Sequence, residues 1–121
     1  MFSARLLYHF RNSRNVGELP PPAVTVEASN PACGDILRLS VRLENQSVVE
    51  ARYKTRGCTA SIAAGSVLTE WMAGKDCTEL AALTPEILAR ELGELPAESG
   101  HAAALAVDAV RELLRVVARK Q

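Results

Sequence analysis

The chain has 121 residues, 48% of them hydrophobic and 23% charged, which is the composition of one ordinary globular domain over residues 1–121. Lysine plus arginine and aspartate plus glutamate each number 14, so no net field attracts nucleic acid or an anionic membrane. The apolar stretches are shorter than the about 20 residues of a membrane span and no secretory signal is visible, so we expect a cytoplasmic protein.

The chain begins with a segment that we separate from the rest of the domain. Leucine and phenylalanine recur at helical spacing over residues 3–11 and predict a short amphipathic helix. The run Pro20-Pro21-Pro22 then excludes helix. We interpret residues 1–22 as a docking arm followed by a stiff linker, and we assign His9, for which the sequence offers no partner, to that arm.

Three strands are predicted next. Apolar and polar residues alternate over residues 24–29, over residues 37–44 and again over residues 49–54, as expected for half-buried strands. The turn-forming residues 45–47 join the second strand to the third as a hairpin.

Helices follow the strands. Residues 59–72 read as a helix with many small side chains, which allow it to lie close to a sheet. Two short helices are predicted over residues 78–83 and 85–92, and a long amphipathic helix opens at His101. The fold class is therefore α+β: a three-stranded antiparallel sheet packed on one face by helices.

The predicted hairpin brings two loops to one end of the sheet. Antiparallel partners pair outward from the turn, so the start of the second strand near Ile36 lies opposite the end of the third near Thr55. The flanking loops carry Cys33 and Asp35 on one side and Cys58 on the other. We expect these three side chains to converge.

Two interpretations of the thiols stay open at this point. Cys58 directly precedes a helix, whose N-terminus favours an anionic thiolate suited to metal or sulfur chemistry, and Gly34 and Gly57 leave room beside the loop thiols. The competing interpretation is that each is a small buried hydrophobe, the commonest role of free cysteine.

Cys77, beyond the helix, is expected to be structural. Three cysteines, an odd number, argue against a disulfide framework.

Several motifs in order resemble a known family, the NifU amino-terminal domain and IscU-type iron-sulfur cluster assembly scaffolds. They cover the chain from about residue 8 onward and comprise Tyr8-His9-Phe10 with residues 12–17, Pro31-Ala32-Cys33-Gly34-Asp35, residues 55–63 and residues 69–75. The absence of an insertion between Cys58 and His101 resembles the IscU branch more than the SufU branch.

The resemblance implies a non-catalytic scaffold. Such proteins receive sulfur from a cysteine desulfurase, assemble a [2Fe-2S] cluster and pass it to apo iron-sulfur recipient proteins, and they also bind zinc at the same place. By resemblance the ligand positions are Cys33, Asp35, Cys58 and His101. Spacing alone does not bring His101 to the thiols.

Ser13 stands where the family usually has proline, and two further departures bear on function. The family has cysteine directly after the histidine, and this chain has Ala102, so one thiol of three is missing and the usual sulfur-transfer route is in question. Residues 97–99 do not reproduce the chaperone-recognition motif, so recognition by a dedicated Hsp70 partner is not expected.

Three hypotheses follow. The first is a variant scaffold or carrier that binds a labile [2Fe-2S] cluster or its iron. The second is a zinc-bound relative that does not assemble clusters and modulates the desulfurase, since two sulfurs, a nitrogen and an oxygen complete a tetrahedral zinc site. The third is an enzyme with Cys58 as nucleophile and His101 as base.

Overall fold

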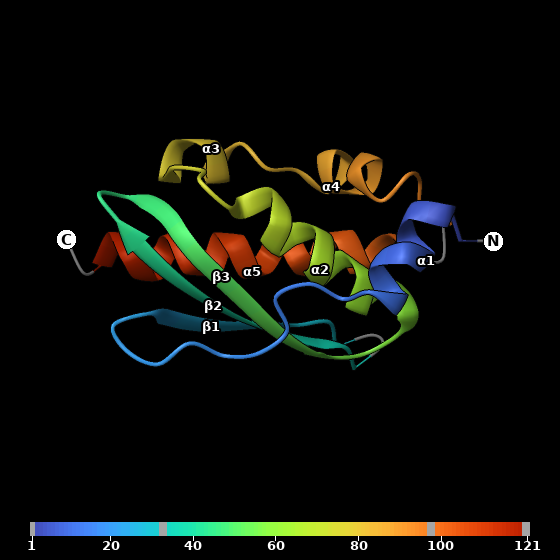
Figure 1. The fold of residues 1–121 in the computed structure, drawn as a ribbon, viewed down its shortest axis with the longest axis horizontal. Helices are drawn as coiled ribbons and strands as arrows, with labels where there is room; N and C mark the ends of the chain where they lie inside the picture. Colours follow the sequence, from blue (N-terminus) through green and yellow to red (C-terminus); the bar gives the residue numbers. More distant parts are fainter. Residues whose placement is uncertain (1, 32–33, 97–98, 120–121) are drawn as a thin grey trace.

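The computed structural model describes residues 2–31, 34–96 and 99–119. Figure 1 shows a sheet with helices layered against it and a long C-terminal helix that runs the length of the domain. In chain order the elements are α1 (Ala4–Arg11), β1 (Val24–Ser29), β2 (Ile36–Glu44), β3 (Ser47–Arg56), α2 (Thr59–Met72), α3 (Cys77–Ala81), α4 (Pro85–Glu91) and α5 (Gly100–Arg119).

The sheet has the predicted topology. Its strands are antiparallel in the order β1-β2-β3, and a tight turn at Asn45 and Gln46, both with positive φ, joins β2 to β3. At the far end of that hairpin Ile36 pairs with Arg56, one residue from the expected pairing. The two loops that carry the candidate ligands therefore leave the sheet at the same end.

Helices α2 and α5 form the core with the sheet. Helix α2 packs on β3, and α5 packs on β1 and β2. The predicted boundaries of α2 match the structure, and its small residues allow the close approach that we expected: Gly65 faces the ring of Tyr53, whose hydroxyl donates a hydrogen bond to the carbonyl of Ile62 at 2.9 Å. The α+β fold class is confirmed.

The N-terminal helix is packed onto the domain. Helix α1 lies against α2, with Leu6 fully buried. His9 is also buried, and its Nδ1 lies 2.9 Å from Oγ of Ser66 in α2, a partner that the sequence did not indicate. No local pattern indicates this contact, because Ser66 lies 57 positions from His9 in the sequence. A docking role for residues 1–22 stays a prediction.

The linker after α1 runs along the edge of β3. The N–H of Gly17 donates to the carbonyl of Tyr53 at 2.8 Å, and the N–H of Tyr53 donates to the carbonyl of Asn15 at 2.9 Å. Glu18 then pairs with Arg38 of β2 at 2.9 Å. These contacts satisfy backbone groups on an edge strand that would otherwise be open to pairing.

The short helices lie on the helical side of the domain. Helix α3 begins one residue earlier than predicted, because Asp76 and Glu79 form a capping box. Helix α4 is capped by Thr84 and begins with Pro85, as predicted. None of the described helices combines the length and the apolar content that crossing a membrane requires.

Candidate metal centre

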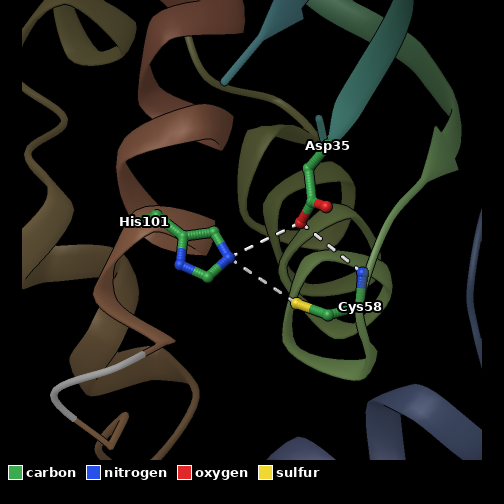
Figure 2. Close-up of side chains that lie close together, drawn as sticks. All are labelled: Asp35, Cys58 and His101. Atoms are coloured by element: carbon green, nitrogen blue, oxygen red, sulfur yellow. Dashed lines mark hydrogen bonds and ion pairs between the residues drawn. The ribbon is translucent and has the colours of Figure 1, made fainter. Parts of the chain in front are cut away.

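Three elements deliver one side chain each to the same end of the sheet. Asp35 directly precedes β2, Cys58 follows β3 and is the N-cap residue of α2, and His101 is the second residue of α5. Figure 2 shows the three side chains pointing toward one another. Register within the hairpin places the first two, and packing of α5 across the sheet supplies the third.

The three ligand-type atoms are close enough to share one ion. Nε2 of His101 lies 3.7 Å from Sγ of Cys58 and 3.5 Å from Oδ2 of Asp35, and one such atom from each residue lies within 4.8 Å of the others. Typical Zn–S and Zn–N bonds are about 2.3 and 2.0 Å long, so an ion between these atoms needs only small side-chain adjustments.

The carboxylate of Asp35 also contacts the N-terminal turn of α2. Cys58, the N-cap residue, makes no side-chain capping hydrogen bond, and the first turn of the helix contains no acidic residue. Oδ2 of Asp35 lies 3.5 Å from the N–H of Cys58 and accepts a 2.6 Å hydrogen bond from the hydroxyl of Ser61. A carboxylate from the sheet thus faces the positive end of the helix dipole.

Gly57 creates the space that the carboxylate occupies. A Cβ built on Gly57 would lie 2.7 Å from Cγ of Asp35 and 2.8 Å from its Oδ2. The sequence predicted that Gly57 leaves room beside the thiol of Cys58, and the structure shows that the carboxylate of Asp35 occupies space next to this glycine.

The site is open on the sulfur side and closed on the carboxylate side. Cys58 is exposed, the side chain of His101 is 28% exposed and that of Asp35 only 10%. The sulfur of Cys58 is therefore accessible to an incoming or departing group, whereas the carboxylate of Asp35 is enclosed by the protein.

Of the other two cysteines, the structure describes Cys77 but not Cys33. Cys33 lies outside the described residues, so its expected convergence with Cys58 stays a prediction. Cys77 lies at the opposite end of the sheet, where its N–H bonds to the carbonyl of Gln46 in the hairpin turn. The ten residues of β3 separate that turn from Cys58, a span of about 30 Å.

The environment of Cys77 agrees with a structural role. Burial, with a smaller contribution from the charge of Asp76, raises the pKa of this thiol. A raised pKa leaves less of the reactive thiolate near neutral pH. Its distance from the site also means that Cys77 cannot supply a ligand to an ion held by Cys58 of the same molecule.

Comparison with known proteins shows the family of the chain. The family model described as the NifU-like N terminal domain matches residues 1–121. The chain belongs to that family. It is 37% identical to the iron-sulfur cluster assembly scaffold protein IscU of Azotobacter vinelandii, over 94% of this chain and 91% of that protein. It is 38% identical to the iron-sulfur cluster assembly enzyme IscU of Drosophila melanogaster, over 94% of this chain and 76% of that protein.

Solved structures agree on the fold of this NifU-like domain. The N-terminal part of a NifU-like protein from Brucella abortus superimposes with a TM-score of 0.81 at 19% identity, covering 98% of this chain and 95% of that one. A structure described as a putative SUF-system scaffold from Fervidobacterium islandicum gives a TM-score of 0.78 at 15% identity, over 93% and 96% of the two chains.

Ala102, where the resemblance places a third cysteine, is 1% exposed and belongs to the core. The alanine methyl group has no metal-binding atom, so the residue after His101 gives this member of the family no sulfur. Residues 97–98, part of the divergent chaperone-recognition segment, lie outside the described residues.

Proposed function

We propose that this chain is an IscU-type scaffold or carrier that holds a labile [2Fe-2S] cluster, or its iron, at Asp35, Cys58 and His101. The observation that carries the proposal is the meeting of a carboxylate, a thiol and an imidazole from three separate elements within 4.8 Å. The identity of more than a third to proteins named as cluster-assembly scaffolds supports it. Cys33 is the fourth ligand that we expect.

The ligand set favours weak retention of a cluster. Two thiols, one imidazole and one carboxylate give four ligands, and mixed sulfur and nitrogen ligation of [2Fe-2S] is known from Rieske centres. Aspartate is a poorer ligand than cysteine for iron in such clusters, since soft thiolates suit iron-sulfur chemistry and carboxylates suit harder ions. The same four groups would suit a tetrahedral zinc ion, so zinc is the alternative occupant that we propose.

The partners follow from that role. A cysteine desulfurase supplies the sulfur, and apo iron-sulfur proteins in the cytoplasm accept the assembled cluster. Ala102 stands in place of one thiol that could accept sulfur from the desulfurase. Among the described cysteines, we therefore expect the exposed Cys58 to accept it. A dedicated Hsp70 partner, nucleic acid and membranes are not part of the proposal.

The test is metal and sulfide analysis of protein purified without oxygen and reconstituted with iron and sulfide. We expect iron and acid-labile sulfide in the wild-type protein and their loss in Cys33→Ser and Cys58→Ser. Cys77→Ser is the matched control, because that thiol lies at the other end of the sheet. Wild-type protein with neither iron nor sulfide under these conditions would end the scaffold proposal.

A second candidate is a zinc-bound relative that modulates the desulfurase without assembling clusters. The observation that favours it is Ala102, which is buried in the core at the position where the resemblance places a thiol. Stoichiometric zinc in the purified protein, with no cluster after reconstitution, would select this candidate. Cluster formation in Ala102→Cys but not in the wild type would identify the missing thiol as the cause.

The enzyme hypothesis ranks last, because Asp35 does not occupy the position of an acid that orients a catalytic histidine. An acid that orients a catalytic histidine contacts the ring nitrogen opposite the one that faces the nucleophile. Here Oδ2 of Asp35 and Sγ of Cys58 both lie nearest the same Nε2 of His101. A carboxylate oxygen and a sulfur that both face the same imidazole nitrogen are typical of side chains that share a metal ion. Alkylation of Cys58 in metal-free protein at the rate of an ordinary thiol would exclude the enzyme.

A further inference from the structure

Ser61, in the first turn of α2, is a buried residue that contacts two of the candidate ligands. It is 1% exposed, its hydroxyl donates to Oδ2 of Asp35 at 2.6 Å, and its Oγ lies 3.5 Å from Sγ of Cys58. The helical pattern of the sequence gives no reason to single it out, because a serine among small residues reads as part of the surface that packs on the sheet.

We propose that Ser61 is the positioning residue of the metal site, holding Asp35 in the orientation in which it binds the ion. This inference rests on the proposed function, because it concerns the same site. The hydroxyl acts through the carboxylate and is not itself a ligand. Groups that hydrogen-bond a metal-ligating side chain fix its orientation and tune its affinity for the ion.

The acceptor positions on the carboxylate oxygens of Asp35 explain why Oδ2 faces His101 and Cys58. Each carboxylate oxygen offers about two acceptor positions. Ser61 occupies one on Oδ2 from the buried side, and the same oxygen faces Nε2 of His101 at 3.5 Å. The hydroxyl therefore turns Oδ2, rather than the other oxygen, toward the space shared with His101 and Cys58.

The hydrogen bond from Ser61 is also shorter than the contacts that Oδ2 makes with Cys58 and His101. At 2.6 Å it has the length of a charge-assisted O–H···O⁻ bond, whereas the N–H of Cys58 lies 3.5 Å from the same oxygen. The carboxylate is 10% exposed, so water cannot readily replace the lost donor. Removing the hydroxyl takes away this donor and weakens the restraint on rotation of the carboxylate about its Cα–Cβ and Cβ–Cγ bonds.

The matched control lies in the same helix. Ser66 is fully buried, and its hydroxyl bonds to His9 and to the N–H of Arg14, each at 2.9 Å, well away from the ligands. Ser66→Ala removes a buried hydroxyl of the same kind and reports what that loss costs the fold. Only Ser61→Ala is expected to change the metal site.

The experiment measures binding of Co²⁺ and Zn²⁺ to metal-free full-length protein by chelator competition, with the visible d–d absorption of Co²⁺ as the spectroscopic readout. We expect Ser61→Ala to weaken both affinities by about ten- to a hundredfold and to change the Co²⁺ spectrum. Ser66→Ala is expected to keep wild-type affinity and spectrum while lowering the unfolding midpoint.

A double-mutant cycle with Asp35→Ala tests whether Ser61 acts through the carboxylate. In the Asp35→Ala background, Ser61→Ala is expected to change the affinity by less than about twofold, because the group it positions is gone. Wild-type affinity in Ser61→Ala, or an equal loss in both backgrounds, would overturn the inference and leave the proposed function intact. Failure of the wild-type protein to bind either ion would instead remove the metal site and both proposals with it.

Discussion

Substitution of Gly57 by alanine tests the geometry of the site with a single methyl group. A Cβ at this position lies 2.7 Å from Cγ of Asp35. The carboxyl carbon must retreat by at least about 0.7 Å to reach the lower limit of ordinary van der Waals contact, 3.4 Å. The backbone of Gly57 does not have a positive φ, so the alanine brings no conformational strain of its own.

The size of that shift predicts a large effect on metal binding. Ligand distances in functional metal sites fall within about 0.2 Å of their ideal values, and a displacement of about 0.7 Å exceeds this tolerance. We therefore expect Gly57→Ala to weaken Zn²⁺ binding by at least the ten- to hundredfold range seen when groups supporting a metal ligand are removed. The displaced carboxylate also leaves the N-terminus of α2, so the metal-free protein is expected to lose about 1 kcal/mol of stability.

Gly100→Ala is the matched control for this prediction. Gly57 directly precedes Cys58 and Gly100 directly precedes His101, but a Cβ on Gly100 meets nothing within 4 Å. Chelator competition gives the Zn²⁺ affinity, and urea unfolding of the metal-free protein gives the stability. Zn²⁺ affinity equal to wild type in Gly57→Ala would refute the assignment of Asp35 as a ligand held in place by this glycine.

Three further predictions concern the rest of the chain. Gly65→Ala places a Cβ 2.3 Å from the buried ring of Tyr53, so urea unfolding should show a loss of about 1–3 kcal/mol; unchanged stability would contradict that close packing. Burial lowers the pKa of His9, so the unfolded chain binds more protons, and stability should fall as the pH drops below 6.5 toward the lowered pKa. His9→Gln should flatten that part of the pH–stability profile, and a profile identical to wild type would exclude His9 as its source. Cys77→Ser should leave Co²⁺ affinity and spectrum unchanged, because about 30 Å separates this residue from the site; an altered spectrum would place a second molecule's thiol at the metal.

Local patterns predicted the hairpin and its consequence for the site. Alternation of apolar and polar residues located β2 and β3, and the turn between them fixed which residues pair. Once Ile36 lies opposite Arg56, the loops that contain Asp35 and Cys58 have to meet. This inference needed only sequence-local information, since the register of a hairpin is set by its own turn.

Contacts between segments that are distant in the sequence could not be predicted from these local patterns. Ser61 and His9 gave no signal in the sequence, because each owes its role to a partner more than 25 positions away. His101 reached the site only through a resemblance to a known family. The distance of 43 positions from Cys58 carries no periodic pattern that helical or strand spacing can reveal.

The sequence by itself determined the three-stranded sheet, the two long helices and the meeting of Asp35 with Cys58, because propensity, hydrophobic period and hairpin register are properties of neighbouring residues. The tertiary structure alone decided that α5 presents His101 to that edge and that Ser61 donates a hydrogen bond to the carboxylate from the buried side. Those outcomes depend on how helices pack across the sheet, and packing is settled by the shape of the whole core.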